Sequence, residues 1–443
     1  MDSLKPKPEE LEHLSIESLG PAAIPSPLLK NKDHFKNDTA KVLVFSEMQR
    51  LGEYQKSGKK LPAFEIAGPQ AKIFFDPKKI ACGIVTCGGL CPGLNDVIRT
   101  VALSLLWQYG VKKVLGFRYG YNGLSKDPFM PPLEITPKVV DEIQHEGGTI
   151  LGSSRGPVEP SEMVDTLEKN KINILFAIGG DGTFRGAHTI CEEIKRRKVP
   201  LAVIGIPKTI DNDIYGSSQT FGFHTAVGKA REAIYAAHEE AKAAWNGIGL
   251  VKLMGRDSGF IAAHATLANS DVNFCFVPEV PFSLEGEDGF LRLLEKRLER
   301  KHHAVIVVSE GAGQDLIQKK EAPKHDESGN IRYKDIGLFL KEHIESHFRE
   351  KKTPLTLKYI DPSYMIRSCP ANAEDSAFCL MLGQNAVHAG MSGKTDIFVG
   401  FWNQHFTHVP FSLGILKKKK LDPSSDLWQT LLETTGQQGR CCL

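Results

Sequence analysis

Short apolar segments alternate with amphipathic stretches from about residue 79 onward. The apolar segments are rich in Val, Ile and Phe and are continuous, a pattern typical of strands that a parallel sheet buries on both faces. We expect strands at Ile80–Thr86, Lys113–Phe117, Asn173–Ile178, Leu201–Ile206, Gly249–Met254, Asn273–Val277, Ala304–Ser309, Thr356–Ile360 and Asp396–Gly400.

Amphipathic periodicity fills most of the intervals between these strands. The stretch Phe223–Trp245, for example, repeats Ala and Ile at three- and four-residue spacing, which places them on one face of a helix. We expect helices at Asn95–Gln108, Arg185–Arg197, Phe223–Trp245, Gly286–Lys301, Ile336–Phe348 and Ala373–Ala389. Strands that alternate with helices form βαβ units, so the predicted fold class is α/β with mainly parallel sheets.

Other parts of the chain lack this alternation. Residues 1–74 are rich in Pro, Lys and Glu, and we expect an N-terminal extension that is partly disordered or wraps another surface. The polar segment Glu321–Arg332 predicts a surface loop, and the run Lys417–Lys420 predicts a solvated segment. The 443 residues exceed the roughly 300 that one core usually supports, which predicts two or three domains.

Charge and composition argue against several classes of protein. The 55 Lys and Arg residues nearly balance 53 Asp and Glu residues, so no basic field favours nucleic acid or a membrane surface. No apolar run approaches the ~18 residues of a membrane span, and the N-terminal segment resembles neither a secretion signal nor a transit peptide. Nine cysteines without metal-type pairs predict reduced thiols. We therefore expect a cytoplasmic protein with no nucleic-acid or membrane partner.

The motif GGLCPGLN, residues 88–95, follows the first predicted strand and opens a helix. Its glycines allow close backbone approach, and a helix N-terminus offers N–H groups to an anion. Taken alone, the motif fits a plain tight turn better. Cys87 and Cys91 flank the Gly88–Gly89 pair; redox control through them is possible, but packed, inert thiols are the favoured interpretation.

The motif GGDGT, residues 179–183, follows a strand predicted to be buried. Open α/β sheets bind ligands at the carboxyl ends of their strands. Gly179, Gly180 and Gly182 allow phosphate oxygens to meet main-chain N–H groups, and Asp181 offers a hard oxygen ligand to Mg²⁺. The alternative is that Asp181 only caps the next helix.

The motif PKTIDND, residues 207–213, also follows a predicted strand. It brings the carboxylates of Asp211 and Asp213 together with Thr209 and Lys208. One carboxylate can take a proton from an attacking hydroxyl, another can serve a metal, and the lysine can neutralise a transferring phosphoryl group. A polar turn with a capping Asx residue is the alternative.

Further candidates are mainly cationic. Arg155 lies in GSSRG, Arg256 in MGRDSG, and Lys358 precedes the segment Tyr364–Arg367. Arginine suits bidentate recognition of phosphate, but each of these cations taken singly is better explained as part of a surface ion pair. Glu310, at the end of a predicted strand, can accept sugar hydroxyls or cap the turn.

The motifs GGLCPGLN, GGDGT, PKTIDND, MGR, SEG and YMIR occur in this order along the chain. A single motif is weak, since GGDGT is shared with NAD kinases and diacylglycerol kinases. The ordered set resembles the phosphofructokinase family, in particular its long-chain ATP-dependent members found in plants, over about Lys79 to Gly414. The resemblance implies two similar three-layer α/β domains with the active site in the cleft between them.

The resemblance also implies which part of the chain builds each domain. The larger, ATP-binding domain would comprise residues 75–222 and 366–416, and the smaller, sugar-phosphate-binding domain residues 223–365 and 417–443. Residues matched to the family's nucleotide site are Gly89, Tyr121, Arg155, Gly156, Gly180, Asp181, Gly182, Thr183 and Gly186. Residues matched to its sugar-phosphate site are Thr209, Ile210, Asp211, Met254, Gly255, Arg256, Glu310, Lys358, Tyr364, Met365, Ile366 and Arg367.

The activity implied is transfer of the ATP γ-phosphoryl group to the 1-hydroxyl of fructose 6-phosphate, the committed step of glycolysis. Asp211 would act as the general base with Lys208 and Thr209 beside it, and Asp181 would bind Mg²⁺. Family resemblance further implies an allosteric homo-oligomer, a tetramer or dimer of dimers. The chain departs from the short bacterial enzymes at Gly247 and Lys358, where they place subunit-crossing arginines, and at Tyr364, where they place a histidine.

The sequence leaves the phosphoryl donor open between two signals. Lys208 resembles the pyrophosphate-dependent members, whereas Gly182 resembles the ATP-dependent ones. We weigh Gly182 more heavily, because an Asp there would intrude on the α-phosphate and repel it. The alternatives are a pyrophosphate-dependent enzyme and a non-catalytic, effector-binding subunit. A nicotinamide dehydrogenase is disfavoured, because no GxGxxG opens a βαβ unit with a downstream acid.

Overall fold

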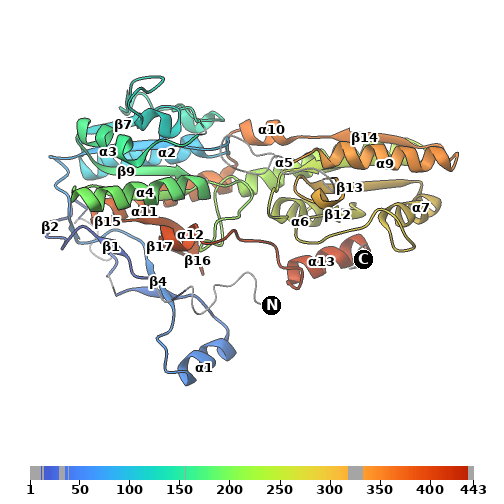
Figure 1. Ribbon diagram of the computed structural model, residues 1–443, viewed down its shortest axis with the longest axis horizontal. Coiled ribbons are helices and arrows are strands. Elements are labelled where there is room, and N and C mark those ends of the chain that lie inside the picture. Colours follow the sequence, from blue (N-terminus) through green and yellow to red (C-terminus); the bar gives the residue numbers. More distant parts are fainter. Residues whose placement is uncertain are drawn as a thin grey trace.

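Two mainly parallel sheets lie side by side along the long axis of the molecule (Figure 1). The computed structural model describes residue 11 and residues 14–28, 35–37, 39–154, 156–317 and 333–437. The predicted α/β fold class with mainly parallel sheets is confirmed. Among the described helices, none combines the length and the apolar character that crossing a membrane requires.

The larger sheet has nine strands in the order β3-β4-β17-β16-β10-β9-β6-β7-β8. Its parallel centre is formed by β16 (Ile397–Trp402), β10 (Ala202–Pro207), β9 (Ile172–Gly179), β6 (Ala81–Thr86) and β7 (Lys113–Phe117). Antiparallel strands form the edges: β8 (Leu133–Glu134) on one side, and β17 (His405–Pro410), β4 (Ala63–Ile66) and β3 (Lys41–Leu43) on the other. Every residue of β6 and β10 is buried, as their continuous apolar sequences predict.

Helices cover both faces of the larger sheet. Successive side chains of β9 point to opposite faces, so Phe176 packs in one apolar core and Leu175 in the other. The first core includes α2 (Leu94–Leu103), which continues as a π-helix over Ser104–Tyr109, and α11 (Ala373–Met391). The second core includes α3 (Pro160–Lys169), α4 (Asp181–Arg197) and α12 (Phe411–Gly414).

The smaller sheet is fully parallel and has the order β12-β13-β11-β14. These strands span Phe274–Phe276 (β12), His303–Ser309 (β13), Gly247–Leu253 (β11) and Thr356–Ile360 (β14). One face packs on α5 (Phe223–Ala243), α6 (Phe260–Leu267), α10 (Ser363–Ser368) and α13 (Asp426–Thr435), and the other on α7 (Phe290–Lys301) and α9 (Ile336–Glu350). The C-terminal helix α13 therefore lies beside the smaller sheet, as Figure 1 shows.

The described part of residues 1–74 wraps the larger sheet of its own chain. β3 and β4 join the edge of that sheet, and β4 pairs with β17 through Ile66 and Thr407. Nearer the N-terminus, β1 (Glu17–Ser18) pairs with β15 (Lys394–Thr395), and β2 (Ile24–Pro25) pairs with β5 (Lys72–Ile73). Helix α1 (Met48–Lys56) projects from the body of the molecule (Figure 1). This segment is thus partly an integral edge of the sheet rather than a separate extension.

All nine predicted strands and all six predicted helices are present, with ends that differ by several residues. The sequence prediction missed α3, α6, α13 and β17. The predicted domain boundary at residue 366 falls inside α10, and Ile366 packs in the core beside α5. The chain therefore returns to the larger sheet only after α10, where α11 begins. The division into two domains otherwise stays a prediction, and the predicted loop Glu321–Arg332 lies outside the described residues.

Candidate active site

Three of the predicted motifs meet because their strands are neighbours in the larger sheet. β6, β9 and β10 run parallel, so the loops after them leave the same edge. The main-chain N–H of Cys87 donates to the Ile178 carbonyl (2.9 Å), and that of Lys208 donates to the Gly179 carbonyl (2.9 Å). The chain is therefore hydrogen-bonded from strand to strand at the points where GGLCPGLN, GGDGT and PKTIDND begin.

Lys208 reaches from the third motif to the first. Its side chain is buried, and Nζ donates to the Gly89 carbonyl at 2.7 Å. A Cβ added to Gly88 would lie 3.4 Å from this Nζ, and the Ser153 hydroxyl donates to the Gly88 carbonyl (2.5 Å). The ammonium is thus held beside the glycine turn, where it can neutralise an anion. The predicted phosphate ligand Arg155, two residues after Ser153, lies outside the described residues.

Asp181 is the first residue of α4 and does not cap it. The N-cap position is Gly180, which has no side chain to bond the helix, so the capping alternative for Asp181 is wrong. Its carboxylate pairs loosely with Arg185 (3.6 Å) and is about one-third exposed (32%). No group of three or more His, Cys, Asp and Glu suited to a metal occurs among the described residues. A single partly exposed carboxylate suits Mg²⁺, which protein side chains hold weakly and substrate phosphates complete.

The surroundings of Asp181 explain the glycines of its motif. A Cβ on Gly179 would lie 2.0 Å from the Thr183 hydroxyl, so a larger residue cannot occupy this turn. A Cβ on Gly182 would meet no atom of the described structure within 4 Å. Gly182 is exposed, and the space beside it is open.

Tyr121 and Gly186, both matched to the family's nucleotide site, lie next to each other. The Tyr121 hydroxyl donates to the Thr183 carbonyl at 2.6 Å from a 3₁₀-helix over Gly120–Leu124. A Cβ on Gly186 would lie 2.5 Å from the Tyr121 ring, so only glycine allows this approach. Gly156 has open space around it and a φ of +119°, a conformation that favours glycine.

Asp211 joins the larger half of the molecule to the smaller half. Its Oδ2 accepts from the main-chain N–H of Arg256 (3.4 Å), and its carbonyl accepts from the Ser258 hydroxyl (3.1 Å). Its Oδ1 is buried and accepts no hydrogen bond from any described residue. Desolvation, followed by the negative charges of Asp213 and Glu310, raises the pKa of Asp211. A buried carboxyl oxygen without a donor is suited to accept a proton from a bound hydroxyl.

The other carboxylate of this motif has a different environment. Asp213 is buried, and its Oδ1 accepts from the Thr209 hydroxyl at 2.6 Å. The Thr209 carbonyl in turn accepts from the Thr220 hydroxyl (2.6 Å). Asp213 therefore shapes the turn, whereas Asp211 keeps one oxygen available for chemistry.

MGR and SEG are joined by main-chain hydrogen bonds at the ends of β11 and β13. Gly311 donates to the Gly255 carbonyl (3.1 Å), and a Cβ on Gly311 would lie 1.8 Å from the Arg256 carbonyl. Burial raises the pKa of Glu310, while the neighbouring charges of Arg256 and Arg367 oppose this shift. The two arginines therefore lie near enough to this carboxylate for their charges to act on it.

Arg367 connects α10 to the first motif. Its guanidinium lies over the Tyr364 ring (5.1 Å to the centroid), and Nη1 would be 3.9 Å from a Cβ on Gly89. The buried Nε has no hydrogen-bond acceptor among the described residues. An anion bound beside Gly89 would supply that acceptor.

Several predicted sugar-phosphate ligands are not directed into the cleft. Met254 and Ile366 are buried in the core around α5, so only their main-chain groups remain for binding. Tyr364 and Met365 are largely exposed on α10. Lys358 is exposed on the edge strand β14 and, within the described part of the chain, has no polar contact with the other predicted ligands. Ile210 is partly buried and packs against both halves.

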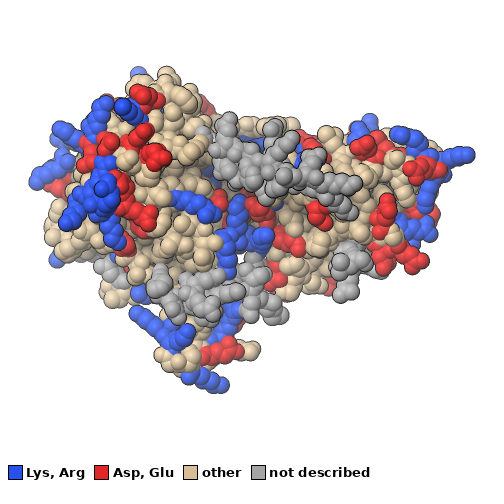
Figure 2. All heavy atoms as spheres, in the orientation of Figure 1, with Lys and Arg blue, Asp and Glu red and all other residues tan. Residues whose placement is uncertain are grey.

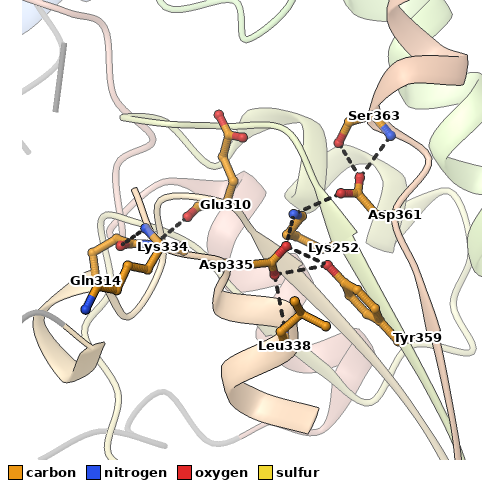
Figure 3. A network of polar contacts seen from close by, with 9 residues as sticks. All are labelled: Lys252, Glu310, Gln314, Lys334, Asp335, Leu338, Tyr359, Asp361 and Ser363. Carbon is orange, nitrogen blue, oxygen red and sulfur yellow. Dashed lines mark hydrogen bonds and ion pairs between the residues drawn. The ribbon is translucent and has the colours of Figure 1, made fainter. Parts of the chain in front are cut away.

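A network of polar contacts surrounds Lys252 (Figure 3). The Lys252 ammonium pairs with Asp335 (2.6 Å) and with Asp361 (2.9 Å). Asp335 caps α9 through the Leu338 N–H (3.0 Å), and Asp361 accepts from the N–H and hydroxyl of Ser363 at the start of α10. One partly buried cation of β11 is therefore linked through Asp361 to the first turn of the helix that carries Arg367. Sequence reasoning missed Lys252, because no motif contains it.

We predict that Lys252→Met raises the KM of the sugar-phosphate ligand of this site about 5- to 20-fold, since loss of a partly buried, hydrogen-bonded charge frees α10. Steady-state kinetics with each substrate varied will measure it. The KM of the nucleotide should change less than 3-fold, which is about the change that a substitution remote from a binding site causes. Lys341→Met, which changes a partly exposed lysine of α9 that pairs only loosely with Glu345 (4.0 Å), is the matched control. An unchanged sugar-phosphate KM in folded Lys252→Met protein would contradict this role.

The run Lys417–Lys420 is not a solvated segment, so that prediction is wrong. Lys418 pairs with Asp257 (2.7 Å) and Asp213 (3.3 Å), and Lys419 donates to the Asn212 side chain and to two main-chain carbonyls of the same turn. Burial would lower the pKa of Lys418, but the neighbouring carboxylates outweigh burial and raise it. Basic and acidic side chains accordingly gather at the junction between the halves (Figure 2).

Cys87 and Cys91 are both buried and form no disulfide. Burial raises the pKa of Cys87 to about 12 and raises that of Cys91 still further. The thiolate is the reactive form, so these thiols suit packing rather than redox control.

Comparisons with known proteins show the family to which the chain is similar. The family described as "Phosphofructokinase" matches residues 81–390. An ATP-dependent 6-phosphofructokinase of Borreliella burgdorferi is 47% identical, with 97% of this chain and 98% of the relative aligned. ATP-dependent 6-phosphofructokinase 7 of Arabidopsis thaliana is 48% identical over 86% of this chain and 78% of the relative. Among solved structures, a pyrophosphate-dependent phosphofructokinase from Marinobacter aquaeolei superposes with a TM-score of 0.65 at 20% identity, covering 81% of this chain and 91% of that one.

Proposed function

This chain belongs to the phosphofructokinase family, and we propose that it is an ATP-dependent 6-phosphofructokinase. The reaction transfers the γ-phosphoryl group of ATP to the 1-hydroxyl of fructose 6-phosphate and yields ADP and fructose 1,6-bisphosphate. The observation that carries the proposal is the buried, unpartnered Oδ1 of Asp211, placed where the motifs of both halves meet. Phosphoryl transfer requires positioning and charge neutralisation more than covalent catalysis, and the site offers both.

Each group of this site has a role in that reaction. Asp211 accepts the proton of the 1-hydroxyl while the oxygen of that hydroxyl attacks the γ-phosphorus atom of ATP. The bond between the γ-phosphorus atom and the bridging β-phosphate oxygen breaks, and ADP leaves. Lys208, held at the Gly89 carbonyl, neutralises charge on the transferring group, and Thr209 orients the turn. Asp181 would hold Mg²⁺, which would offset the charge of the nucleotide phosphates. Arg367 and Arg256 hold the anionic and hydroxyl groups of the sugar phosphate.

The phosphoryl donor is assigned to ATP on the open space at Gly182. Apart from its chain neighbours and the backbone of its own helix, a Cβ at that position would meet no described atom within 4 Å, which leaves room for the α-phosphate and the nucleoside beyond it. Lys208 does not discriminate, since it can serve the transferring group of either donor. The pyrophosphate-dependent structural neighbour shares the fold at 20% identity and so does not bear on the donor. A non-catalytic subunit is disfavoured, because Asp181, Thr209, Asp211 and Arg256 are all present.

We predict that wild-type protein converts fructose 6-phosphate with Mg²⁺ and ATP and is essentially inactive with pyrophosphate. Gly182→Asp should raise the KM of ATP at least ~10-fold, because a carboxylate would intrude on the α-phosphate and repel it. The KM of fructose 6-phosphate should change much less. A coupled assay of fructose 1,6-bisphosphate with each donor tests both statements. Robust pyrophosphate-driven turnover by the wild type would overturn the donor assignment. So would a Gly182→Asp variant whose KM for ATP equals that of the wild type.

The same proposal extends to assembly and location. Tyr364, Met365 and Lys358 are exposed beside the sugar-phosphate side of the site, which favours an oligomer in which a second copy covers them. A homotetramer or dimer of dimers with allosteric control follows from the family, and the reduced, buried thiols suit a cytoplasmic enzyme. Light scattering at defined protein concentrations will report the assembly.

A further inference from the structure

The segment after α12 crosses from the larger sheet to the smaller one and passes the turn of PKTIDND. Its main chain pairs there: Lys418 forms a β-bridge with Ile214, and the Lys419 N–H donates to the Asp213 carbonyl at 2.8 Å. The Lys419 ammonium then bonds the Asn212 amide oxygen (3.0 Å) from behind. The backbone of this segment therefore places both lysines against the turn.

The Lys418 ammonium is bonded to both halves of the molecule at once. Asp213, at 3.3 Å, belongs to the turn after β10 in the larger sheet. Asp257, at 2.7 Å, follows β11 in the smaller sheet and is the neighbour of Arg256. Both carboxylates are held by a second donor, since Thr209 bonds Asp213 and Tyr333 bonds Asp257. Lys418 is thus the cation at the centre of a chain of contacts that spans the cleft.

We propose that Lys418 is a positioning residue for phosphoryl transfer: its ammonium ties Asp213 to Asp257 and so holds the turn that carries Thr209 and Asp211 in register with Arg256. This inference rests on the proposed function. It goes beyond that function because the run Lys417–Lys420 belongs to none of the motifs that identify the family.

The contacts explain why the effect should fall on turnover. In-line transfer requires the attacking hydroxyl, held on the Arg256 side, to face the donor phosphate, held on the Asp181 side. A misplacement of about 1 Å can cost about 100-fold in rate while each substrate still binds its own half. Lys418 contacts the carboxylates that orient both halves, so its loss should disturb their relative position rather than either binding site.

The first test is Lys418→Met, which keeps the length of the side chain and removes the charge. We expect kcat to fall about 10- to 100-fold, with the KM values of ATP and fructose 6-phosphate each within about 3-fold of wild type. Lys418→Arg, which can still pair with both carboxylates, should recover part of kcat. Lys420→Met, in the same run but exposed, is the matched control and should leave kcat unchanged.

A double-mutant cycle with Asp257→Asn separates positioning from general destabilisation. If Lys418 acts through Asp257, the two substitutions together should lower kcat by clearly less than the product of their separate effects. Additive effects, or a kcat of Lys418→Met within 3-fold of the wild-type value, would overturn the proposal.

Hydrogen exchange provides a readout that does not depend on the proposed activity. Amides of residues 208–219 should exchange faster in Lys418→Met than in wild type, and Lys420→Met should match wild type. If Lys418→Met fails to fold, the same comparison is made with Asp257→Asn, which removes the partner across the cleft. Unchanged exchange in the folded variant would overturn the proposal. A wild type without phosphofructokinase activity would refute the proposed function instead, and exchange would still decide whether Lys418 holds the turn.

Discussion

Asp211→Asn should lower kcat at least ~100-fold, with a much smaller change in the affinity for fructose 6-phosphate. The substitution keeps the shape of the side chain and its place beside the Arg256 N–H, but an amide cannot take the proton of the 1-hydroxyl. The Oδ1 atom that would take this proton is buried and accepts no hydrogen bond from any described residue. Initial rates over a range of both substrates, together with equilibrium binding of fructose 6-phosphate, will separate the two effects.

The pH dependence provides a second measurement of the same group. Only the carboxylate form can act as a base, and desolvation raises the pKa of Asp211 above that of an ordinary aspartate. In the wild type, kcat should therefore fall as the pH decreases through this raised pKa, and the residual activity of Asp211→Asn should lack that decline. Asp288→Asn, which changes an exposed carboxylate of the smaller half, is the control. Near-normal kcat in Asp211→Asn would remove this residue from the mechanism.

Arg367→Ala should act mainly on binding. The guanidinium has a buried Nε without an acceptor among the described residues, and the family resemblance assigns this arginine to the unreacting 6-phosphate. Losing a desolvated, charge-assisted contact costs about 2–4 kcal/mol, which raises the KM of fructose 6-phosphate about 30-fold or more. A smaller loss of kcat is expected, because remote binding energy also assists turnover.

Two comparisons make the Arg367 experiment specific. Arg367→Lys keeps the charge but loses the planar, bidentate geometry, so its KM should lie between those of the wild type and Arg367→Ala. The KM of ATP should stay near the wild-type value in both variants. An unchanged fructose 6-phosphate KM in Arg367→Ala would show that α10 does not hold the 6-phosphate.

The sequence predicted those parts of the site that depend on local pattern. Continuous apolar segments identified the buried strands β6, β9 and β10, and glycine-rich motifs at their ends identified the loops that meet there. This works because neighbouring parallel strands release their loops at one edge of a sheet. Even the need for glycine at residue 179 follows from a contact within its own motif, with Thr183.

Residues that act across long sequence distances could not be predicted in this way. Lys252 contacts partners 83 and 109 residues away, and nothing near it in the sequence distinguishes it from a surface lysine. Met254 and Ile366 stand inside matched motifs, yet their side chains belong to the core around α5. A motif gives the order of residues, but the packing of the surrounding helix decides which side chain enters the cleft.

The sequence by itself determined the fold class, the buried strands and the position of the glycine-rich loops, because these depend on periodicity and turn chemistry within a few residues. Only the tertiary structure decided that residues 41–66 complete the edge of the larger sheet and that Lys418 and Lys419 lie in the site. The physical reason is that a run of lysines is most stable in water unless carboxylates and carbonyls surround it. Asp213, Asp257 and the carbonyls of the turn come from segments about 160 to 205 residues away and reach these ammoniums only when the two halves pack together.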